Sequence, residues 1–287
     1  MKKYIPHLQV LLAATLWGCI GIFSRLLLAG GLSASNIVTV RIFGGFVILT
    51  AVMLCTDRSV FHVKLRDLPC LFAMGVGSVL MNTWFYIRCQ QLCSLAVSAV
   101  LLYTAPAIVV LINALVYRER ITRRKLLALV FALLGCTLVT GLWNGGLSVT
   151  PLGLALGLCC GFCYALYSVF GPFVLKKYAP MTVVYWAFFF AGIGSLFVMD
   201  APALAACFTA NPALLLPSLG LMVFCMVMPY VFYTRGLSRL EGGEACILAS
   251  LEPVVATFAG ILVFGEPASF SVFAGLGCIL VCVYILR

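Results

Sequence analysis

Residues 243–266 read GEACILASLEPVVATFAGILVFGE. Between Ala245 and Phe264 the sole charged residue is Glu252, and Pro253 follows it directly. An apolar helix of about 20 residues is about 30 Å long, which matches the hydrocarbon core of a bilayer. We therefore expect this stretch to cross a membrane as a helix. It would carry a carboxyl group near its middle and a proline that interrupts its backbone hydrogen bonding.

The whole chain shares the composition of this stretch. Of its 287 residues, 64% are hydrophobic and 9% are charged, and the mean hydropathy is +1.18, whereas soluble domains carry about 25% charged residues. Apolar runs separated by short polar breaks predict an all-α integral membrane protein with ten spans, at residues 8–29, 34–55, 67–88, 93–117, 125–143, 150–175, 180–199, 214–234, 243–264 and 268–286. These spans leave almost no chain outside the bilayer, which excludes an extramembrane catalytic domain.

The basic residues predict the orientation of these spans. Of the 18 Lys and Arg residues, 15 precede the first span, follow an even-numbered span or end the chain; the exceptions are Arg25, Arg41 and Arg88. The connections around 144–149, 200–213 and 265–267 carry no Lys or Arg. Because cytoplasmic loops are rich in Lys and Arg, we expect a multi-pass protein of the cell (inner) membrane with both termini in the cytoplasm. This topology accounts for the net charge of +10 and leaves no reason to expect a nucleic-acid partner.

The sequence also repeats itself at a constant offset of 147 residues. This offset places Phe85, Tyr86 and Arg88 on Phe232, Tyr233 and Arg235 without a gap, and it also pairs Pro106 with Pro253, Glu119 with Glu266, and Trp17-Gly18 with Tyr164-Ala165. Each half then contains five spans, and because five is an odd number the second half must enter the membrane from the opposite side. Such inverted repeats are typical of secondary transporters with a central site.

These paired motifs resemble those of a known family. The aromatic-small pairs, the prolines of the fourth span in each half (Pro106, and Pro253 in Leu-Glu-Pro), the glutamates that close that span, and Arg41 followed by Phe43 are similar to the EamA-type domains of the drug/metabolite transporter (DMT) superfamily. The resemblance implies two five-helix repeats, at residues 1–143 and 148–287, that enclose a central cavity, and proton- or gradient-coupled movement of small metabolites. Tyr117-Arg118-Glu119 departs from the pattern that Phe264-Gly265-Glu266 follows.

Glu252 is the principal candidate for a functional residue. An ionisable side chain at the centre of a bilayer costs on the order of 2.5–3.5 kcal/mol by insertion scales, so its presence calls for a reason. It could carry a proton or bind the ammonium group of a substrate. The alternative is a structural carboxyl group that forms a hydrogen bond to a neighbouring helix or stabilises the kink at Pro253.

Two further polar residues fall inside predicted spans. Arg41 could pair with Glu252, bind a substrate carboxylate, or extend to the outer membrane surface. Asn82 could line the cavity or form a hydrogen bond between helices. For Asn113 a bond to a neighbouring helix is the simpler interpretation.

Aromatic side chains are the remaining candidates for substrate contact. We expect Trp17, Tyr86, Tyr103, Tyr164, Tyr167, Tyr230 and Tyr233 to lie near the cavity, where they could stack on a flat or cationic ligand. Packing without ligand contact is an equally good interpretation for about half of them.

Small residues predict where spans approach each other closely. Gly153, Gly157 and Gly161 recur every four residues, which gives the sixth span a smooth face. We expect this face to pack on the first span, through Ala14 and Gly18, although the same groove could mediate a homodimer. Glu119 and Glu266 would bind the N-terminal amides of the helices that follow them.

Several classes of protein lack support in the sequence. It has no phosphate-binding loop, no HExxH zinc motif and no GxSxG nucleophile elbow, so neither an ATP-driven pump nor an enzyme is expected. Cys159, Cys160 and Cys163 lack a second ligand pair for zinc, so we expect no metal or cofactor. The sequence therefore predicts a secondary transporter of a small-molecule substrate, with export of amino acids or related compounds favoured. The alternatives are uptake of an organic amine with Glu252 as counter-ion, and a non-transporting membrane subunit.

Overall fold

The computed structural model describes residues 4–93, 95–139, 150–265 and 270–286, and over these ranges the chain forms helices and no strands. The first half comprises α1 (Ile5–Gly18), α2 (Ile20–Ala29), α3 (Ala34–Thr56), η2 (Arg58–Phe61), η3 (Leu65–Asp67), α4 (Leu68–Phe72), η4 (Ala73–Met81), α5 (Asn82–Leu92), α6 (Leu95–Leu102), α7 (Ala105–Val116) and α8 (Arg123–Val139). The all-helical fold class is thus confirmed for the described residues.

The second half repeats this order with its own interruptions. It comprises α9 (Pro151–Leu175), α10 (Pro180–Ser195), η6 (Leu196–Val198), α11 (Ala201–Ala210), η7 (Pro212–Leu214), α12 (Leu215–Met222), η8 (Val223–Val227), α13 (Met228–Leu237), α14 (Gly242–Leu248), η9 (Ala249–Leu251), α15 (Glu252–Phe264) and α16 (Phe270–Leu286). The short helix α11 lies in what the sequence suggested was a plain connection, and the Asp200 carboxylate accepts a hydrogen bond from its Ala203 N–H.

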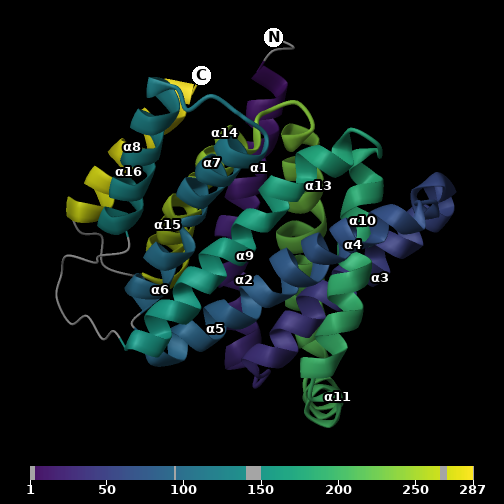
Figure 1. Ribbon diagram of the computed structural model, residues 1–287. Helices are drawn as coiled ribbons and strands as arrows, with labels where there is room; N and C mark the ends of the chain where they lie inside the picture. Colours follow the sequence, from purple (N-terminus) through teal and green to yellow (C-terminus); the bar gives the residue numbers. More distant parts are fainter. Residues whose placement is uncertain (1–3, 94, 140–149, 266–269, 287) are drawn as a thin grey trace.

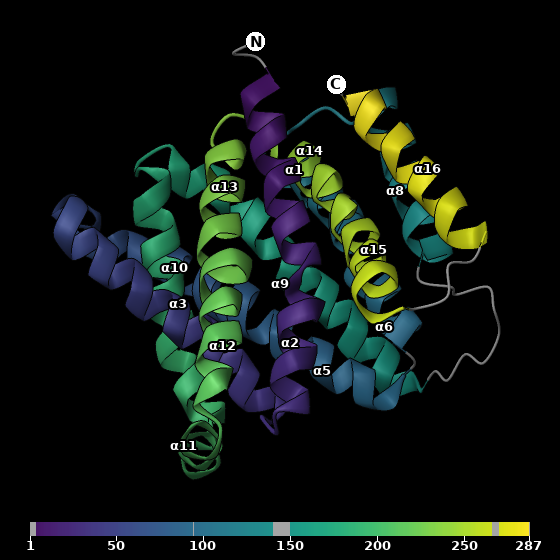
Figure 2. The same cartoon turned by 180° about the vertical axis from the view of Figure 1, so that it is seen from behind.

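Eight helical stretches of the described chain are long and apolar enough to cross a membrane. The predicted fifth and tenth spans, α8 and α16, are described over 17 residues each, which is at the short limit for a span. The two helices lie side by side at one edge of the bundle (Figures 1 and 2). A multi-pass membrane protein is therefore established, and the count of ten spans remains a prediction.

The two halves pack through equivalent spans. Helix α3 packs on α10, α7 on α14 and α8 on α16, while α1 of the first half packs on α13 of the second and α9 packs on α5 in return (Figures 1 and 2). Helix α1 runs away from the end of the molecule that carries both termini, and its counterpart α9 runs toward that end (Figure 1). The hydrophobic cluster that includes Val10, Trp17, Phe188 and Tyr233 consequently combines residues of both halves.

Interruptions of the helices also recur at equivalent positions. The third span of each half contains a wide π-helical segment, η4 in the first and η8 in the second. The fourth span of each half is interrupted just before its proline, at Tyr103-Thr104 before Pro106 and at η9 before Pro253. A proline removes a backbone donor and clashes with the preceding turn, so the interruption that Pro253 predicts is confirmed.

Arg118 adopts the backbone conformation of the glycine at the equivalent position of the second half. Gly265 ends α15 in the left-handed region with φ 66°, and Arg118 follows α7 with φ 55°. A side chain in this region costs about 1 kcal/mol relative to glycine. We expect Arg118→Gly to raise the free energy of unfolding by up to about 1 kcal/mol, measured by chemical denaturation in detergent. Arg120→Gly, which replaces a nearby arginine, is the control, and an equal gain from both variants would contradict this account.

The smooth face of α9 packs on a different partner from the expected one. A Cβ atom at Gly161 would lie 2.5 Å from the Thr104 hydroxyl and 2.7 Å from the Leu101 carbonyl oxygen, and Gly157 likewise faces Leu101. The glycines of α9 thus fit the first half's fourth span, whereas Gly18 of α1 faces α15. The expectation that α1 and α9 meet through these residues is wrong, because each packs across the molecule on spans of the opposite half.

Some predictions lie outside the described residues. These are the role of Glu266, the junction at 144–149, and the positions of Lys2, Lys3 and Arg287.

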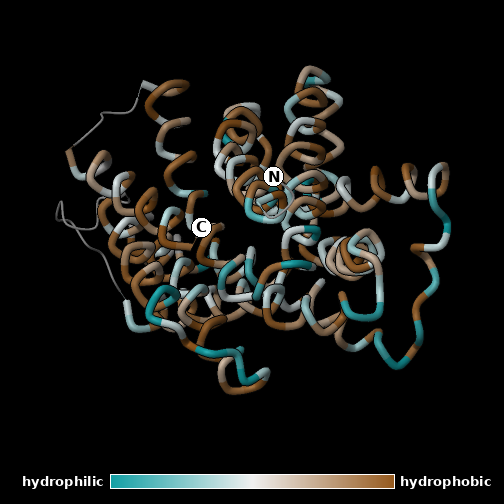
Figure 3. The backbone as a smooth tube through the Cα atoms, turned by 90° about the horizontal axis from the view of Figure 1, so that it is seen from above, coloured by the Kyte–Doolittle hydropathy of each residue, from teal (hydrophilic) through white to brown (hydrophobic). Residues whose placement is uncertain are grey.

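Seen from the end that carries both termini, the helices are mostly hydrophobic and the hydrophilic residues gather in connecting segments (Figure 3).

Candidate functional site

A cavity of about 490 Å³ lies between the two halves. Its walls come from both halves: the first half contributes residues of α1, α2, α3, η4, α5 and α6, and the second half contributes residues of α9, η8, α13 and α15. Its lining includes Trp17, Tyr230 and Glu252, and it also includes Leu28, near the C-terminal end of α2, and Ala34, the first residue of α3. The end of α2 and the start of α3 lie at the end of the molecule opposite the termini (Figure 1). The size is typical of sites for small molecules.

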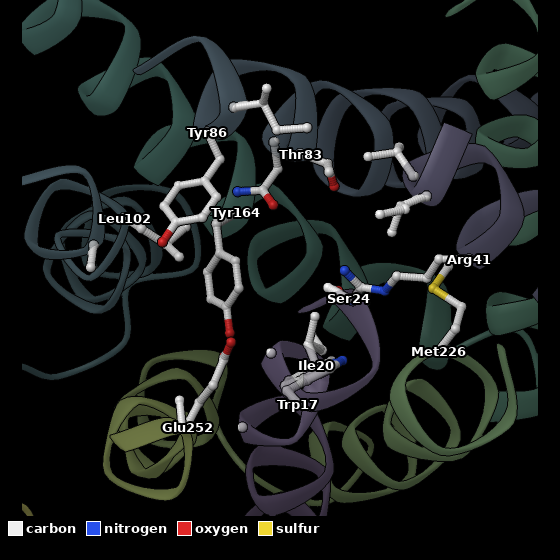
Figure 4. Close-up of a pocket in the computed structure, with 18 of the residues that line it drawn as sticks. Trp17, Ile20, Ser24, Arg41, Thr83, Tyr86, Leu102, Tyr164, Met226 and Glu252 are labelled. Atoms are coloured by element: carbon white, nitrogen blue, oxygen red, sulfur yellow. The ribbon is translucent and has the colours of Figure 1, made fainter. Parts of the chain in front are cut away.

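Glu252 is placed in this cavity by the interruption of its helix. The 3-10 turn η9 precedes it and Pro253 follows it as the second residue of α15, so the carboxyl group lies at the junction between the 3-10 turn and the α-helix. Figure 4 shows the side chain pointing into the cavity, with Tyr164 pointing toward it. Within the described ranges, no ion pair involves Glu252.

Arg41 enters the same cavity from the opposite wall. It lies on α3, and its guanidinium group points toward Ser24 on α2 (Figure 4). Its Nε atom is buried without a hydrogen-bond partner among the described residues. A buried donor without a partner is costly, so the group is suited to an anionic ligand. The geometry does not match the interpretation in which Arg41 extends to the membrane surface.

The predicted aromatic residues divide into two groups. Trp17, Tyr86, Tyr103, Tyr164 and Tyr230 line the cavity. Tyr167 and Tyr233 do not line it; their hydroxyl groups form hydrogen bonds with Thr234 and Ser168, each at 2.7 Å.

The two groups nevertheless touch each other at the inner end of the cavity. The Trp17 ring meets the rings of Tyr230 and Tyr233 at centroid distances of 5.3 Å. Tyr167 likewise meets Tyr230, at 5.3 Å. Tyr167 and Tyr233, which do not face the cavity, therefore support the aromatic residues that form its inner end.

Asn82 takes both of the roles considered for it. It lines the cavity, and its side-chain amide donates a hydrogen bond of 3.2 Å to the Cys160 carbonyl oxygen of α9. Asn113 instead donates to Glu119 at 3.2 Å, within its own half.

Several residues of the lining were not predicted from the sequence, among them the small hydroxyl residues Ser24, Thr83 and Thr257, and the apolar Met226. A signal for some of them was present. Trp17, Gly21, Ser24 and Leu28 follow one another at the three- and four-residue spacing of a helix face, and all four line the cavity.

Beyond the aromatic residues at the inner end of the cavity, polar contacts join the two halves at the end that carries the termini. His7 of α1 and Glu244 of α14 are in contact at 2.8 Å. Lys125 of α8 pairs with Glu241, which precedes α14, and also lies 3.4 Å from Glu119. The cavity is therefore closed toward this end by side chains from both halves.

Glu119 does not bind the N-terminal amides of the next helix. Its carboxylate accepts the Asn113 amide and pairs with Lys125, while the Thr122 hydroxyl accepts the Lys125 N–H at the start of α8. The expectation that Glu119 binds these amides is wrong, because Thr122 supplies the oxygen that accepts a backbone N–H at the start of α8. The role of Glu119 is still structural.

The lining suits binding rather than covalent chemistry. An arginine and a carboxylate face a common space lined with aromatic rings, which suits a small molecule that carries an anionic and a cationic group. Within the described part of the chain, no group of three or more His, Cys, Asp or Glu residues could hold a metal ion.

Comparison with known proteins supports transport. The inner membrane transporter YicL of Salmonella typhimurium, named as uncharacterized, is 25% identical over 279 residues, which cover 96% of this chain and 91% of YicL. The threonine/homoserine exporter RhtA of Escherichia coli K12 is 28% identical over 224 residues, which cover 76% of this chain and 70% of RhtA.

The fold has also been seen before. A solved crystal structure aligns with 98% of this chain and 95% of its own chain, with a TM-score of 0.79 at 17% sequence identity. The EamA-like transporter family matches twice, at residues 5–141 and at residues 151–287. With both halves matched, the chain belongs to the EamA-like transporter family.

Proposed function

We propose that this protein is a secondary transporter that exports small zwitterionic metabolites, amino acids foremost, by alternating access. A single observation carries the proposal: Arg41 and Glu252 enter one cavity from opposite walls. The carboxylate of an amino acid would meet Arg41, and its ammonium group would meet Glu252. The similarity to the named threonine/homoserine exporter supports this class of substrate.

The proposal includes the architecture that alternating access needs. Two inverted five-helix repeats, ten spans and cytoplasmic termini would make the closed end of the cavity cytoplasmic and its open end external. The opposite courses of α1 and α9 and the packing of equivalent spans support such a symmetry. Exchange of the contacts between the halves would then close one end and open the other.

Glu252 would also couple transport to protons. One carboxylate can hold either a proton or the ammonium group of a substrate, so the two would compete for the same position. If the protein changes the side to which its cavity opens only when Glu252 holds either a proton or the substrate, each substrate molecule that leaves is exchanged for a proton that enters.

The proposal is tested with a matched set of three ligands. Threonine carries both charges, 1-amino-2-propanol lacks the carboxylate, and 3-hydroxybutyrate lacks the amino group. A ligand stabilises the folded protein by mass action, so we expect threonine to raise the midpoint of thermal unfolding, and each analogue to bind at least tenfold more weakly. Export from proteoliposomes of labelled threonine is expected to follow the same order.

Uptake of an organic amine is the second candidate, because aromatic rings surround Glu252 and favour a cation. In that case 1-amino-2-propanol or a larger amine would bind as tightly as the zwitterion, and Arg41 would contribute nothing. Binding of no compound together with no flux would favour a non-transporting subunit and contradict both candidates.

A further inference from the structure

A second cavity, of about 480 Å³, lies at the C-terminal end of α9, which runs toward the end of the molecule that carries the termini (Figure 1). Its walls come from the segment that contains η3 and from the C-terminal end of α9 with the residues that follow. The residues that matter here are Lys64, Arg66, Asp67, Phe173, Lys177 and Tyr178. Nothing in the transport cavity involves them.

The charge of this pocket is positive after its internal pairing is counted. Asp67 is the pocket's sole carboxylate, and both of its oxygens are occupied: one accepts the Lys177 ammonium at 2.6 Å and the other accepts the Tyr178 hydroxyl at 2.8 Å. The structure pairs neither Lys64 nor Arg66 with a carboxylate in the described part of the chain. Two cationic side chains therefore remain available to an anion.

The walls of the pocket are fixed relative to each other. The Tyr178 hydroxyl accepts the Lys64 backbone N–H at 3.0 Å while it donates to Asp67. This chain of bonds ties the segment around η3, from the first half, to the end of α9, from the second. A site held in this way before a ligand arrives loses little freedom when the ligand binds.

Apolar side chains flank the cations. Leu65, between Lys64 and Arg66, is 83% exposed, and Phe173 is 44% exposed with the Lys177 ammonium 4.6 Å from its ring centroid. Cations beside exposed apolar groups at a membrane boundary match a ligand with a phosphate and acyl chains. A soluble phosphate compound would use the cations and leave the apolar groups without a partner.

We propose that this pocket binds the phosphate headgroup of an anionic phospholipid, through Lys64 and Arg66, with its acyl chains along Leu65 and Phe173. In the orientation proposed above, this lipid belongs to the cytoplasmic leaflet. Because the walls come from both halves, an occupant also bridges them at the closed end, and so stabilises the present arrangement.

The test uses the purified full-length chain in a neutral detergent. Phosphatidylglycerol is added and the midpoint of thermal unfolding is measured, with phosphatidylcholine of the same acyl chains as the neutral lipid. Glycerol phosphate and inorganic phosphate represent the free anion. Native mass spectrometry counts the phosphatidylglycerol that stays bound, which gives a readout independent of transport.

The variants separate this pocket from general surface charge. Lys64→Gln/Arg66→Gln removes both free cations, and Arg123→Gln/Arg124→Gln removes two exposed arginines from the start of α8, outside the pocket. Because all four side chains are exposed, both double variants are expected to fold, and their midpoints in phosphatidylcholine check this. Arg66→Gln alone serves if the first double variant unfolds.

We expect phosphatidylglycerol to bind at least tenfold more weakly to Lys64→Gln/Arg66→Gln than to the wild type, with little change for Arg123→Gln/Arg124→Gln. Equal losses in both double variants would mean diffuse attraction to surface charge and overturn the proposal. Full binding by the first double variant would overturn it as well. If glycerol phosphate stabilised the protein as strongly as the lipid, the pocket would be a site for a soluble phosphate compound.

Discussion

Replacing Glu252 by glutamine is expected to weaken the binding of threonine by roughly 10- to 150-fold. Hydrogen bonds that involve a charged group contribute about 1.5–3 kcal/mol, and each 1.4 kcal/mol is tenfold in affinity. Glutamine keeps the size of the side chain and removes the charge that would hold the ammonium group. The measurement is the concentration of threonine that gives half of the maximal thermal stabilisation.

The reciprocal variant makes this result specific. Arg41→Gln is expected to cause a similar loss for threonine, but the two variants should differ toward the analogues. Glu252→Gln should still bind 3-hydroxybutyrate through Arg41, and Arg41→Gln should still bind 1-amino-2-propanol through Glu252. Tyr167→Phe is the matched control, because it changes a buried polar group that does not line the cavity.

A different outcome would identify Glu252 as a structural residue. If Glu252→Gln lowered the stability of the protein and left threonine affinity unchanged, its carboxyl group would serve the interrupted helix alone. Unchanged binding together with loss of flux driven by a pH gradient would instead assign Glu252 to proton movement.

Gly18→Ala is expected to destabilise the protein, whereas Gly21→Ala, one turn further along, should not. A Cβ atom at Gly18 would lie 2.5 Å from Val255 Cβ and 2.8 Å from the Glu252 carbonyl oxygen, but one at Gly21 would have nothing within 4 Å. Overpacking costs typically about 1–3 kcal/mol, which corresponds to a fall of roughly 2–12 °C in the midpoint of thermal unfolding.

This pair of variants is closely matched, because both glycines line the cavity and lie on the first span. Gly21→Ala should leave the midpoint unchanged or raise it slightly, since alanine is a better helix former. Equal effects of the two changes would show that the close contact between α1 and α15 is unimportant. Weaker threonine binding in Gly18→Ala is expected as well, because the added methyl group displaces the backbone of Glu252.

The sequence predicts the general plan because the bilayer leaves few alternatives. Apolar runs of sufficient length must be helices, and Pro253 must interrupt the one that contains it. Rotation of a helix about its axis is harder to predict. Tyr164 and Tyr230 face the cavity whereas Tyr167 and Tyr233 do not, although each pair is three residues apart and differs by only about 60° around the helix.

Contacts between segments that are distant in the sequence could not be predicted either, because they also depend on how the helices pack. Asp67 of η3 and Lys177, which follows α9, are 110 residues apart in the sequence, and their contact depends on how the ends of the third and sixth spans pack against each other. The sequence allowed two directions for the long Arg41 side chain, into the protein or toward the membrane surface, because it is long enough to reach either. Its choice follows from the direction of α3, which depends on the packing of α3 against α10.

The wide turns η4 and η8 have a consequence for how such a chain can diverge. In a continuous α-helix, the loss of one residue turns all later side chains by about 100°, which would move Tyr86 off its wall. A π-helical turn already holds an additional residue, so a deletion inside η4 can be absorbed as that turn tightens to the α form. Asn82 and the residues beyond it would keep their faces. Each half thus contains a place where a single codon can be lost or gained while the lining of the cavity stays intact.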